Sequence, residues 1–267
     1  MREIRLEAGL SGRDLGRLAG WHSSKISKIE YARQAPTPAD IRIWCEHCAA
    51  DDVALELVVS LHNIDSLFVE WRRMERAGFK HLAETLNVVW DQARHYRIYS
   101  GLLVPGPVQT ADYVRALLGS IRSRRNVIDD VEDAVQLRML RQQSIHHRDR
   151  RFAIVVEESA LRHRFGGVET MAGQLGYLLT VGTIPGVSLG VIPLDADRTL
   201  VWPTEPFHLF DNDHVAVETL TGMLTIRQSW EVAAYAQAFA GLAKLAVYGA
   251  KARALIAQSI TALDALP

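Results

Sequence analysis

Two short segments on either side of a glycine, near the start of the chain, constrain the fold more than any other feature. The first segment follows Ser11, whose hydroxyl can cap a helix, and Asp14 three residues later completes a pattern like a capping box. Gly16 allows a neighbouring helix to approach closely, and Gly20 is placed to end the helix and to start a tight turn. A second short helix is expected from about Ser23 to Tyr31. The pattern therefore predicts two short helices joined by a tight turn.

The second of these helices has a single apolar stripe. Ile26 and Ile29 lie one turn apart, so they share a face that can pack on a core. The remaining side chains are short or cationic and have no reason to be buried: Ser23, Ser24, Lys25, Ser27 and Lys28. A helix with one apolar stripe and one hydrogen-bonding face meets the requirement for insertion into the major groove of DNA. The sequence therefore predicts a protein that binds DNA.

The run RLEAGLSGRDLGRLAGWHSSKISKIE, from Arg5 to Glu30, resembles the lambda-repressor-like (XRE-type) helix-turn-helix family. The resemblance implies that Ser23, Ser24 and Lys28 read bases. It also implies a set of residues near DNA phosphates: Ser11, Gly12, His22, Lys25, Ser27, Arg33 and Gln34. Arg5 and Glu30 match positions that pair as a structural salt bridge in relatives. The first helix, with only Met1 to Ala8 before the turn, is shorter than is usual in the family, so either the native start codon lies upstream or phosphate contacts at that end are missing.

Composition argues against several classes of protein. The 267 residues carry a net charge of −1, which argues against a protein that coats nucleic acid through charge alone. Hydrophobic residues make up 48% of the chain, enough to bury a core. Nothing resembles a signal peptide or a membrane span, so we expect a cytoplasmic protein with no membrane contact. Cys45 and Cys48 give no disulfide framework and lack the second ligand pair of a zinc site, so no metal or other cofactor is expected.

We expect an α+β fold class with three parts along the chain. Residues 1–63 form an all-α helix-turn-helix domain, residues 64–80 a helical linker, and residues 81–267 a larger mixed α+β domain. Helices are expected over Leu86–Arg97, Thr110–Leu118, Asp129–Ile145 and Trp230–Leu263. Strands are expected over Phe152–Val156, Val187–Pro193, Phe207–Phe210, His214–Leu220 and Met223–Ile226. Turns at residues 211–213 and 221–222 join the last three strands into an antiparallel meander.

Several runs of the second domain carry a further resemblance: YSGLLVPGPVQTADYVRALL, AVQLRMLRQQSI, FAIVVEESALRHRFGGVETMAGQLGYLL, IPGVSLGVIPL and HVAVETLTGMLTI. They are similar to the large C-terminal domain of an actinobacterial family that includes WhiJ-like and antitoxin-like regulators. The resemblance implies a homodimeric regulator, a repressor, that binds a double-stranded DNA operator. It also implies that the second domain controls DNA binding through a small protein encoded by an adjacent gene.

Two alternatives remain open from the residues alone. In the first, the second domain senses a small molecule in a pocket lined by Trp202, Tyr177 or Phe207, rather than binding a protein on a flat apolar patch. In the second, the chain is a DNA-acting hydrolase in which Glu157 and Glu158 converge with two of the aspartates Asp195, Asp197, Asp211 and Asp213. Acidic residues at strand ends and turns are usually just solvated, so we expect that the protein is not an enzyme.

Overall fold

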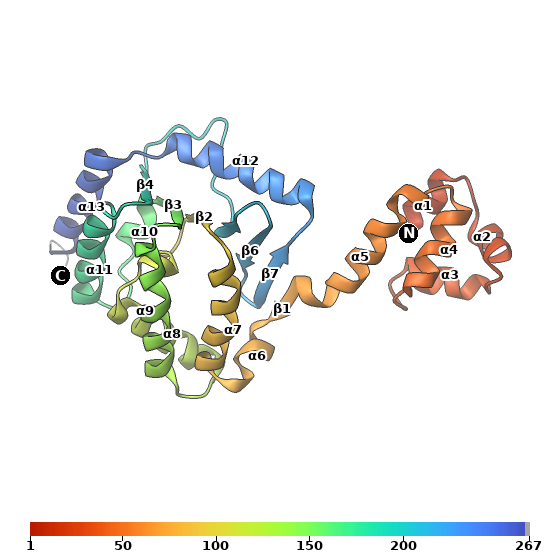
Figure 1. Cartoon of the computed structure of the whole chain (residues 1–267), viewed down its shortest axis with the longest axis horizontal. Coiled ribbons are helices and arrows are strands. Elements are labelled where there is room, and N and C mark those ends of the chain that lie inside the picture. The colour runs from red at the N-terminus through yellow and green to blue at the C-terminus, as the bar shows by residue number, and fades with distance from the viewer. Residues whose placement is uncertain (265–267) are drawn as a thin grey trace. The chain divides into compact units, whose positions relative to one another are not determined.

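The computed structural model describes residues 1–264. The chain divides into two compact units, Met1–Leu67 and Phe68–Pro267, which we call the N-terminal and the C-terminal unit (Figure 1). The predicted fold class is confirmed, because a helical N-terminal region precedes a larger unit in which helices cover a mixed sheet. Within the described part of the chain, no helix is both long and apolar enough to cross a membrane.

The N-terminal unit is built from helices. They are α1 (Arg2–Glu7), α2 (Gly12–Ala19), α3 (Ser23–Glu30), α4 (Pro38–His47) and α5 (Asp51–Leu67). α2 packs against α3 and α4, and α4 packs against α5. The apolar stripes of these helices meet in a core around Leu15, Ile26 and Trp44, which are almost fully buried. Isolated helices as short as α2 and α3 are marginal in water, so this shared core is what stabilises them.

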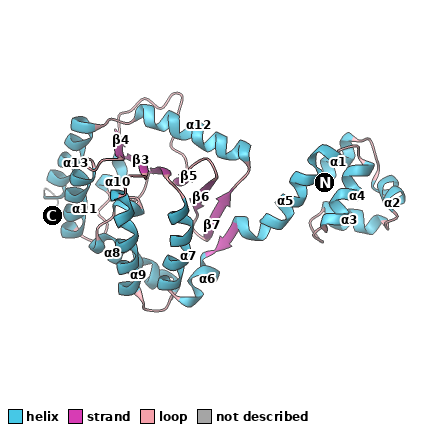
Figure 2. Ribbon diagram, viewed as in Figure 1, coloured by secondary structure: helices cyan, strands magenta, loops and turns pink. Residues whose placement is uncertain are grey.

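A mixed sheet lies at the centre of the C-terminal unit (Figure 2). Its strands are β1 (Phe68–Glu70), β2 (His95–Ser100), β3 (Arg151–Glu157), β4 (Val187–Ile192), β5 (Phe207–Phe210), β6 (His214–Glu218) and β7 (Gly222–Ile226). Their order across the sheet is β1-β7-β6-β5-β2-β3-β4. β2, β3 and β4 are parallel, and the other neighbouring pairs are antiparallel. The predicted meander of β5, β6 and β7 is thereby confirmed.

Helices cover both faces of this sheet. The longer ones are α7 (Phe79–Gln92), α8 (Ala111–Arg125), α9 (Val131–Gln142), α11 (Val168–Val181), α12 (Ser229–Leu245) and α13 (Gly249–Asp264), and the short ones are α6 (Trp71–Met74) and α10 (Glu158–Arg162). On one face, Trp90 of α7 and Leu175 of α11 share a cluster with Ile154 of β3. On the other face, Phe239 of α12 shares a cluster with Phe207 of β5.

The structure corrects two helix predictions near the start of the C-terminal unit. The helix expected over Leu86–Arg97 ends at Gln92, and His95–Ser100 form the central strand β2. Pairing with β3 and β5 on its two sides outweighs the helical spacing of this segment. The helix expected through residues 64–80 is interrupted at Phe68–Glu70, because these residues pair with β7 as the edge strand β1. Residues 68–80 therefore belong to the C-terminal unit and are not a separate linker.

A third correction concerns the last helical segment. The single helix expected over Trp230–Leu263 is two helices, because α12 ends at Leu245 and α13 begins at Gly249. Between them, Val247 forms an antiparallel bridge with Val191 of β4. Gly249 has a φ of 58°, a left-handed conformation that glycine adopts readily. The bridge extends the pairing of the edge strand β4 and turns the chain between the two helices.

Candidate nucleic-acid interface

The turn between α2 and α3 is shaped by a cap and by two glycines. Ser11 Oγ accepts a hydrogen bond from the N–H of Asp14 at 3.1 Å, and the Asp14 carboxylate accepts one from the N–H of Ser11 at 3.2 Å, so the predicted capping box is confirmed. Gly20 ends α2 with a φ of 67°. The N–H of Trp21 then donates to the carbonyl of Gly16 at 2.7 Å. A Cβ at Gly16 would lie 2.9 Å from the Trp21 carbonyl oxygen, so the tight turn requires glycine there.

α3 has the two faces that the sequence predicts. Ile26 and Ile29 are buried in the core of the N-terminal unit. The exposed side chains of α3 are Ser23, Ser24, Ser27 and Lys28. The three predicted base readers therefore lie on the outer side of a helix whose inner side is fixed to the core. This arrangement presents hydroxyl and ammonium groups at the spacing of one helix face, as base reading in the major groove requires.

His22 caps α3, a role that the sequence analysis did not assign to it. Its Nδ1 accepts a hydrogen bond from the N–H of Ser24 at 3.2 Å and lies 2.8 Å from Ser24 Oγ. The imidazole thus satisfies one of the N–H groups that a helix start leaves unpaired. Any base that the Ser24 hydroxyl contacts must share it with His22.

Lys25 has an intramolecular partner in addition to its predicted phosphate contact. Its Nζ lies 2.6 Å from Oδ1 of Asp40 in α4 and 4.0 Å from the centroid of the Trp21 ring. Burial disfavours the Asp40 carboxylate, but hydrogen bonds from Lys25 and Thr37 outweigh that effect and lower the pKa of Asp40. The Lys25 ammonium therefore fixes α3 to α4, and a DNA phosphate would have to share it with Asp40.

The other predicted phosphate contacts lie at the two ends of the motif. Ser11 and Gly12 lie at the N-terminus of α2, where the capping carboxylate is 2.5 Å from Ser11 Oγ and occupies the position that favours an anion. Arg33 and Gln34 follow α3 with exposed side chains, and their N–H groups donate to the carbonyl of Lys28 at 2.7 and 3.2 Å. The exposed charge of Arg33 makes it better suited to a phosphate than the capped end of α2.

Arg5 and Glu30 form the ion pair that the resemblance implies. Nε and Nη2 of Arg5 lie 2.5 and 3.0 Å from the two carboxylate oxygens of Glu30, and Nη1 donates to the carbonyl of Leu10 at 2.6 Å. Only 9% and 8% of the two side chains are exposed. The hydrogen bond to Glu30 raises the pKa of Arg5. The pair joins α1 to the end of α3 from inside the unit and does not face DNA.

Further exposed groups beside this motif were missed by the sequence analysis. Tyr31, which follows α3, is 60% exposed, and the Arg2 guanidinium lies 5.7 Å from its ring centroid. Arg13 and Arg17 are exposed on α2, one turn apart on the same helix face. That spacing of two cations was the available signal, and it places positive charge on the polar side of the first motif helix.

The two cysteines that were considered for a disulfide or a zinc site lie in the hydrophobic core of the N-terminal unit. Cys45 and Cys48 are buried free cysteines of the N-terminal unit, and burial raises the pKa of both thiols. Across residues 1–264, no group of three or more histidine, cysteine, aspartate or glutamate side chains is placed to hold a metal ion.

The carboxylates that a hydrolase would need have structural partners. Glu157 accepts a hydrogen bond from the Tyr99 hydroxyl at 2.7 Å and forms an ion pair with Arg198. Glu158 lies 2.5 Å from the guanidinium of Arg162. Asp197 accepts hydrogen bonds from Thr199, and Asp213 pairs with His214 and Arg227. Each of these four carboxylates therefore has a hydrogen-bond or ion-pair partner within the chain.

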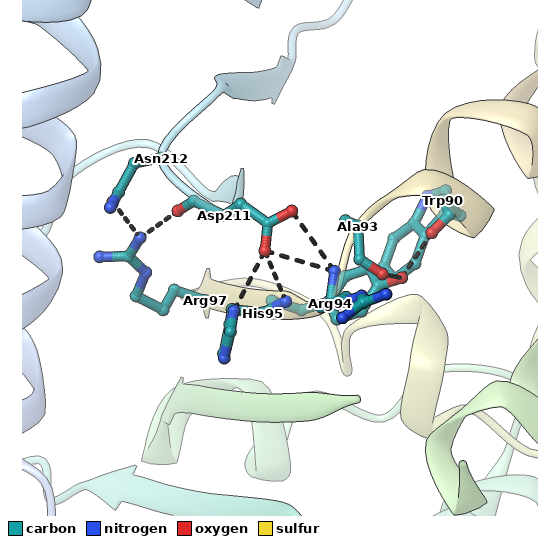
Figure 3. Close-up of polar contacts among 8 residues, drawn as sticks. Trp90, Ala93, Arg94, His95, Arg97, Asp211 and Asn212 are labelled. Atoms are coloured by element: carbon teal, nitrogen blue, oxygen red, sulfur yellow. Dashed lines mark hydrogen bonds and ion pairs between the residues drawn. The ribbon is translucent and has the colours of Figure 1, made fainter. Parts of the chain in front are cut away.

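Asp211 fastens the turn between β5 and β6 to the start of β2 (Figure 3). Its carboxylate accepts hydrogen bonds from the N–H groups of His95, at 2.8 Å, and Arg94, at 3.3 Å. Arg97 donates to the carbonyl of Asp211 and, at 2.6 Å, to the side chain of Asn212. Asp211 is therefore a turn residue that holds the end of β5 against the start of β2.

The residues expected to line a ligand pocket differ in their exposure. Phe207 is buried, Tyr177 is half-buried, and Trp202 is 70% exposed. Two cavities on the C-terminal unit are lined by residues of α8, α9 and their neighbours and contain none of these aromatic residues.

The capped turn and the exposed face of α3 define the class of the protein, a DNA-binding regulator with a helix-turn-helix. In agreement, a helix-turn-helix domain model matches residues 1–58. The model of DUF5753, a domain of unknown function, matches residues 84–258, and the chain belongs to this family.

The comparisons with solved structures and with curated proteins give no further assignment. Among solved structures, the chain is similar to TrmBL2, described as an archaeal chromatin protein with a novel mode of DNA binding. The two share 12% sequence identity over 90% of this chain and 88% of that chain. The TM-score of 0.33 is too low for this likeness to bear on fold or function. No curated protein matches the chain.

Proposed function

We propose that the protein is a sequence-specific transcriptional repressor of the XRE type that acts as a homodimer in the cytoplasm. The observation that carries the proposal is the division of α3: its apolar side is buried in the core, and its serines and Lys28 face outward. Each N-terminal unit would place α3 in a major groove, and two units would read half-sites spaced by whole helical turns. The protein acts by binding and not by catalysis.

The C-terminal unit would regulate DNA binding through a small protein encoded by an adjacent gene, as in WhiJ-like and antitoxin-like regulators. The support is a segment without regular secondary structure between β4 and β5. It carries three large apolar side chains that are mostly exposed: Leu194 at 63%, Leu200 at 86% and Trp202 at 70%. Exposed apolar groups of this size are typical of protein interaction surfaces. Their exposure favours a protein partner over a ligand enclosed around Trp202.

The test of DNA reading is a binding-site selection from a random duplex library with the full-length protein at one fixed salt concentration. The expected motif has two inverted half-sites whose centres lie about 10 base pairs, or a multiple, apart. Absence of any selected motif would contradict sequence-specific binding. A single half-site, bound by a monomer, would contradict the homodimer.

The test of partner binding is a pull-down of the products of adjacent genes, with and without the selected operator. The variants Leu200→Ser and Trp202→Ser are compared with Ile128→Ser, which removes an apolar side chain of similar exposure (59%) between α8 and α9. We expect capture by the wild type and by Ile128→Ser, and loss in the other two variants. Equal capture by all four proteins would exclude this segment as the partner site.

A further inference from the structure

Trp71 anchors the segment through which the chain enters the C-terminal unit. Its ring is buried in a cluster with Leu118 of α8, and its Nε1 donates to the carbonyl of Thr219, in the turn between β6 and β7, at 2.8 Å. The Trp71 N–H donates to the carbonyl of Thr221 in the same turn at 3.0 Å. These contacts give α6, and the 3₁₀ turn Glu75–Ala77 that follows it, a fixed place on this unit.

The C-terminal end of α8 lies against this segment. Arg125, the last residue of α8, places its guanidinium 5.3 Å from the centroid of the Trp71 ring. Its Nη1 lies 2.5 Å from Oε1 of the buried Glu75, and its Nη2 donates to the carbonyl of Leu220. The residues next to Glu75 in the segment and next to Arg125 in α8 therefore belong to one end of the C-terminal unit.

Exposed arginines surround this junction, and we call them the arginine surface: Arg72, Arg73, Arg76 and Arg124. Among the residues that the structure describes, their guanidinium groups have no ion-pair or hydrogen-bond partner. Several other exposed arginines of the same unit are paired with carboxylates, as Arg115 is with Glu132 and Arg227 is with Asp213. The arginine surface is therefore a local concentration of cations that the chain itself leaves available.

Carboxylates of the same segment do not neutralise these arginines. Glu75 is already paired, and Glu70, which precedes α6, can offset only one of the free charges. In a helical segment, residues three and four apart are neighbours, so Arg76 lies next to Arg72 and Arg73, and the like charges repel one another. An anion bound to this surface would relieve the repulsion.

The chemistry and the place of the arginine surface indicate its partner. The planar guanidinium fork fits the oxygens of a phosphate, and duplex DNA offers a row of phosphates to several arginines at once. Arg72 follows Leu67, the last residue of the N-terminal unit, by five residues, which span at most about 18 Å. We propose that the arginine surface binds DNA phosphates outside the base pairs that α3 reads. This inference rests on the proposed DNA binding and adds to it a second contact, independent of sequence, from the C-terminal unit.

The test measures the affinity of the full-length protein for two duplexes by fluorescence anisotropy at several salt concentrations. One duplex holds only the selected operator, and the other extends it on each side by about 10 base pairs, one helical turn. The triple variant Arg72→Gln/Arg73→Gln/Arg76→Gln should bind the longer duplex about tenfold or more weakly than the wild type. The slope of log affinity against log salt should fall in magnitude by about two to three, because each phosphate contact contributes about 0.9. The affinity for the shorter duplex should change little.

The control variant Arg148→Gln/Arg164→Gln/Arg253→Gln removes the same charge from other exposed positions of the C-terminal unit. The guanidinium groups there also have no ion-pair partner among the described residues. The control variant should bind both duplexes like the wild type. Equal affinities and equal salt slopes of the triple and control variants on the longer duplex would overturn the proposal. So would a triple variant that binds both duplexes like the wild type but no longer captures the product of the adjacent gene, because the arginine surface would then contact a protein.

Arg124→Gln keeps the test decisive if the triple variant does not fold, because it changes an exposed residue of α8 and leaves the short helix α6 intact. It should lower the salt slope on the longer duplex by about one, whereas Arg148→Gln should leave that slope unchanged. Equal slopes for these two single variants would overturn the proposal. Wild-type binding to the operator separates these failures from failure of the proposed function, in which the wild type would select no operator.

Discussion

The ion pair between Arg5 and Glu30 should decide whether the N-terminal unit stays folded. Arg5→Met removes the guanidinium and keeps much of the side-chain volume. It leaves the Glu30 carboxylate, whose side chain is 8% exposed, without its two hydrogen bonds, and it leaves the Leu10 carbonyl without the one from Nη1. Glu30→Met leaves the Arg5 charge buried with only that carbonyl as an acceptor. Each single change therefore strands a charge away from water.

The expected cost follows from this burial. Removal of one partner of a buried, hydrogen-bonded ion pair costs about 3–5 kcal/mol, because the remaining charge keeps its desolvation penalty. The Arg5→Met/Glu30→Met double variant strands no charge, so it should lose less stability than the sum of the two single variants. At about 1.36 kcal/mol per factor of ten, each single variant should lose roughly two to almost four orders of magnitude of protection in this unit.

Hydrogen exchange followed by mass spectrometry measures this loss in the full-length protein. Peptides from α2, α3 and α4 report the N-terminal unit, and peptides from β3 and β4 provide the internal control. Unchanged protection in both single variants would refute the reasoning. So would a double variant that loses the full sum of the single losses, because the two side chains would then act independently.

The remaining predictions concern the recognition helix, the tight turn and the response to pH. Lys25→Ala should destabilise the N-terminal unit by about 1–3 kcal/mol, because it leaves the buried Asp40 carboxylate without its cation, and it should also weaken binding to all DNA. Lys28→Ala, which removes an exposed side chain, should leave the stability of this unit unchanged. Equal hydrogen-exchange protection in the two variants would contradict the positioning role of Lys25. Gly16→Ala should destabilise the N-terminal unit by about 1–3 kcal/mol, because the new Cβ would crowd the turn. Gly12→Ala is the control, since a Cβ there would lie at an ordinary 3.5 Å from its nearest neighbour. Equal unfolding temperatures of the two variants would show that the turn is not tight. Burial lowers the pKa of His214 despite a hydrogen bond with a neighbouring carboxylate, so the unfolded state binds its proton more tightly. The C-terminal unit should therefore lose stability as the pH falls below about 6.5 and through the lower folded-state pKa, and His214→Gln should flatten this dependence in denaturant titrations; equal slopes would contradict the assignment.

Features with a local cause could be predicted from the sequence. The capping serine, Gly20 and the apolar pair Ile26 and Ile29 define α2, the turn and α3 through contacts within about 20 residues. Strands β3 to β7 were also predictable, because each is an apolar run whose ends are marked by turn residues in the sequence. The outward face of α3 followed directly from the inward position of the two isoleucines.

Features defined by distant partners could not be predicted in this way. Phe68–Glu70 is a strand only because β7 lies beside it, about 150 residues later in the sequence. β2 has its place because β3 and β5 bond to it on both sides, and its own residues had helical spacing with those before it. The partner of Lys25 is on another helix, so the sequence offered only its charge. Pairing between elements, rather than propensity within them, decided each of these cases.

The most direct test of the central claim, that the outer face of α3 reads bases, is the affinity of Lys28→Ala for single-base-pair variants of the selected operator. A lysine that donates to guanine in the major groove contributes about 1–3 kcal/mol at one position per half-site. Arg42→Ala, which removes an exposed cation of α4, is the matched control. The account predicts that Lys28→Ala loses this energy at the operator and no longer discriminates at one base pair per half-site, while Arg42→Ala keeps the wild-type preference at every position. Identical base-pair preferences for Lys28→Ala and the wild type would contradict the claim.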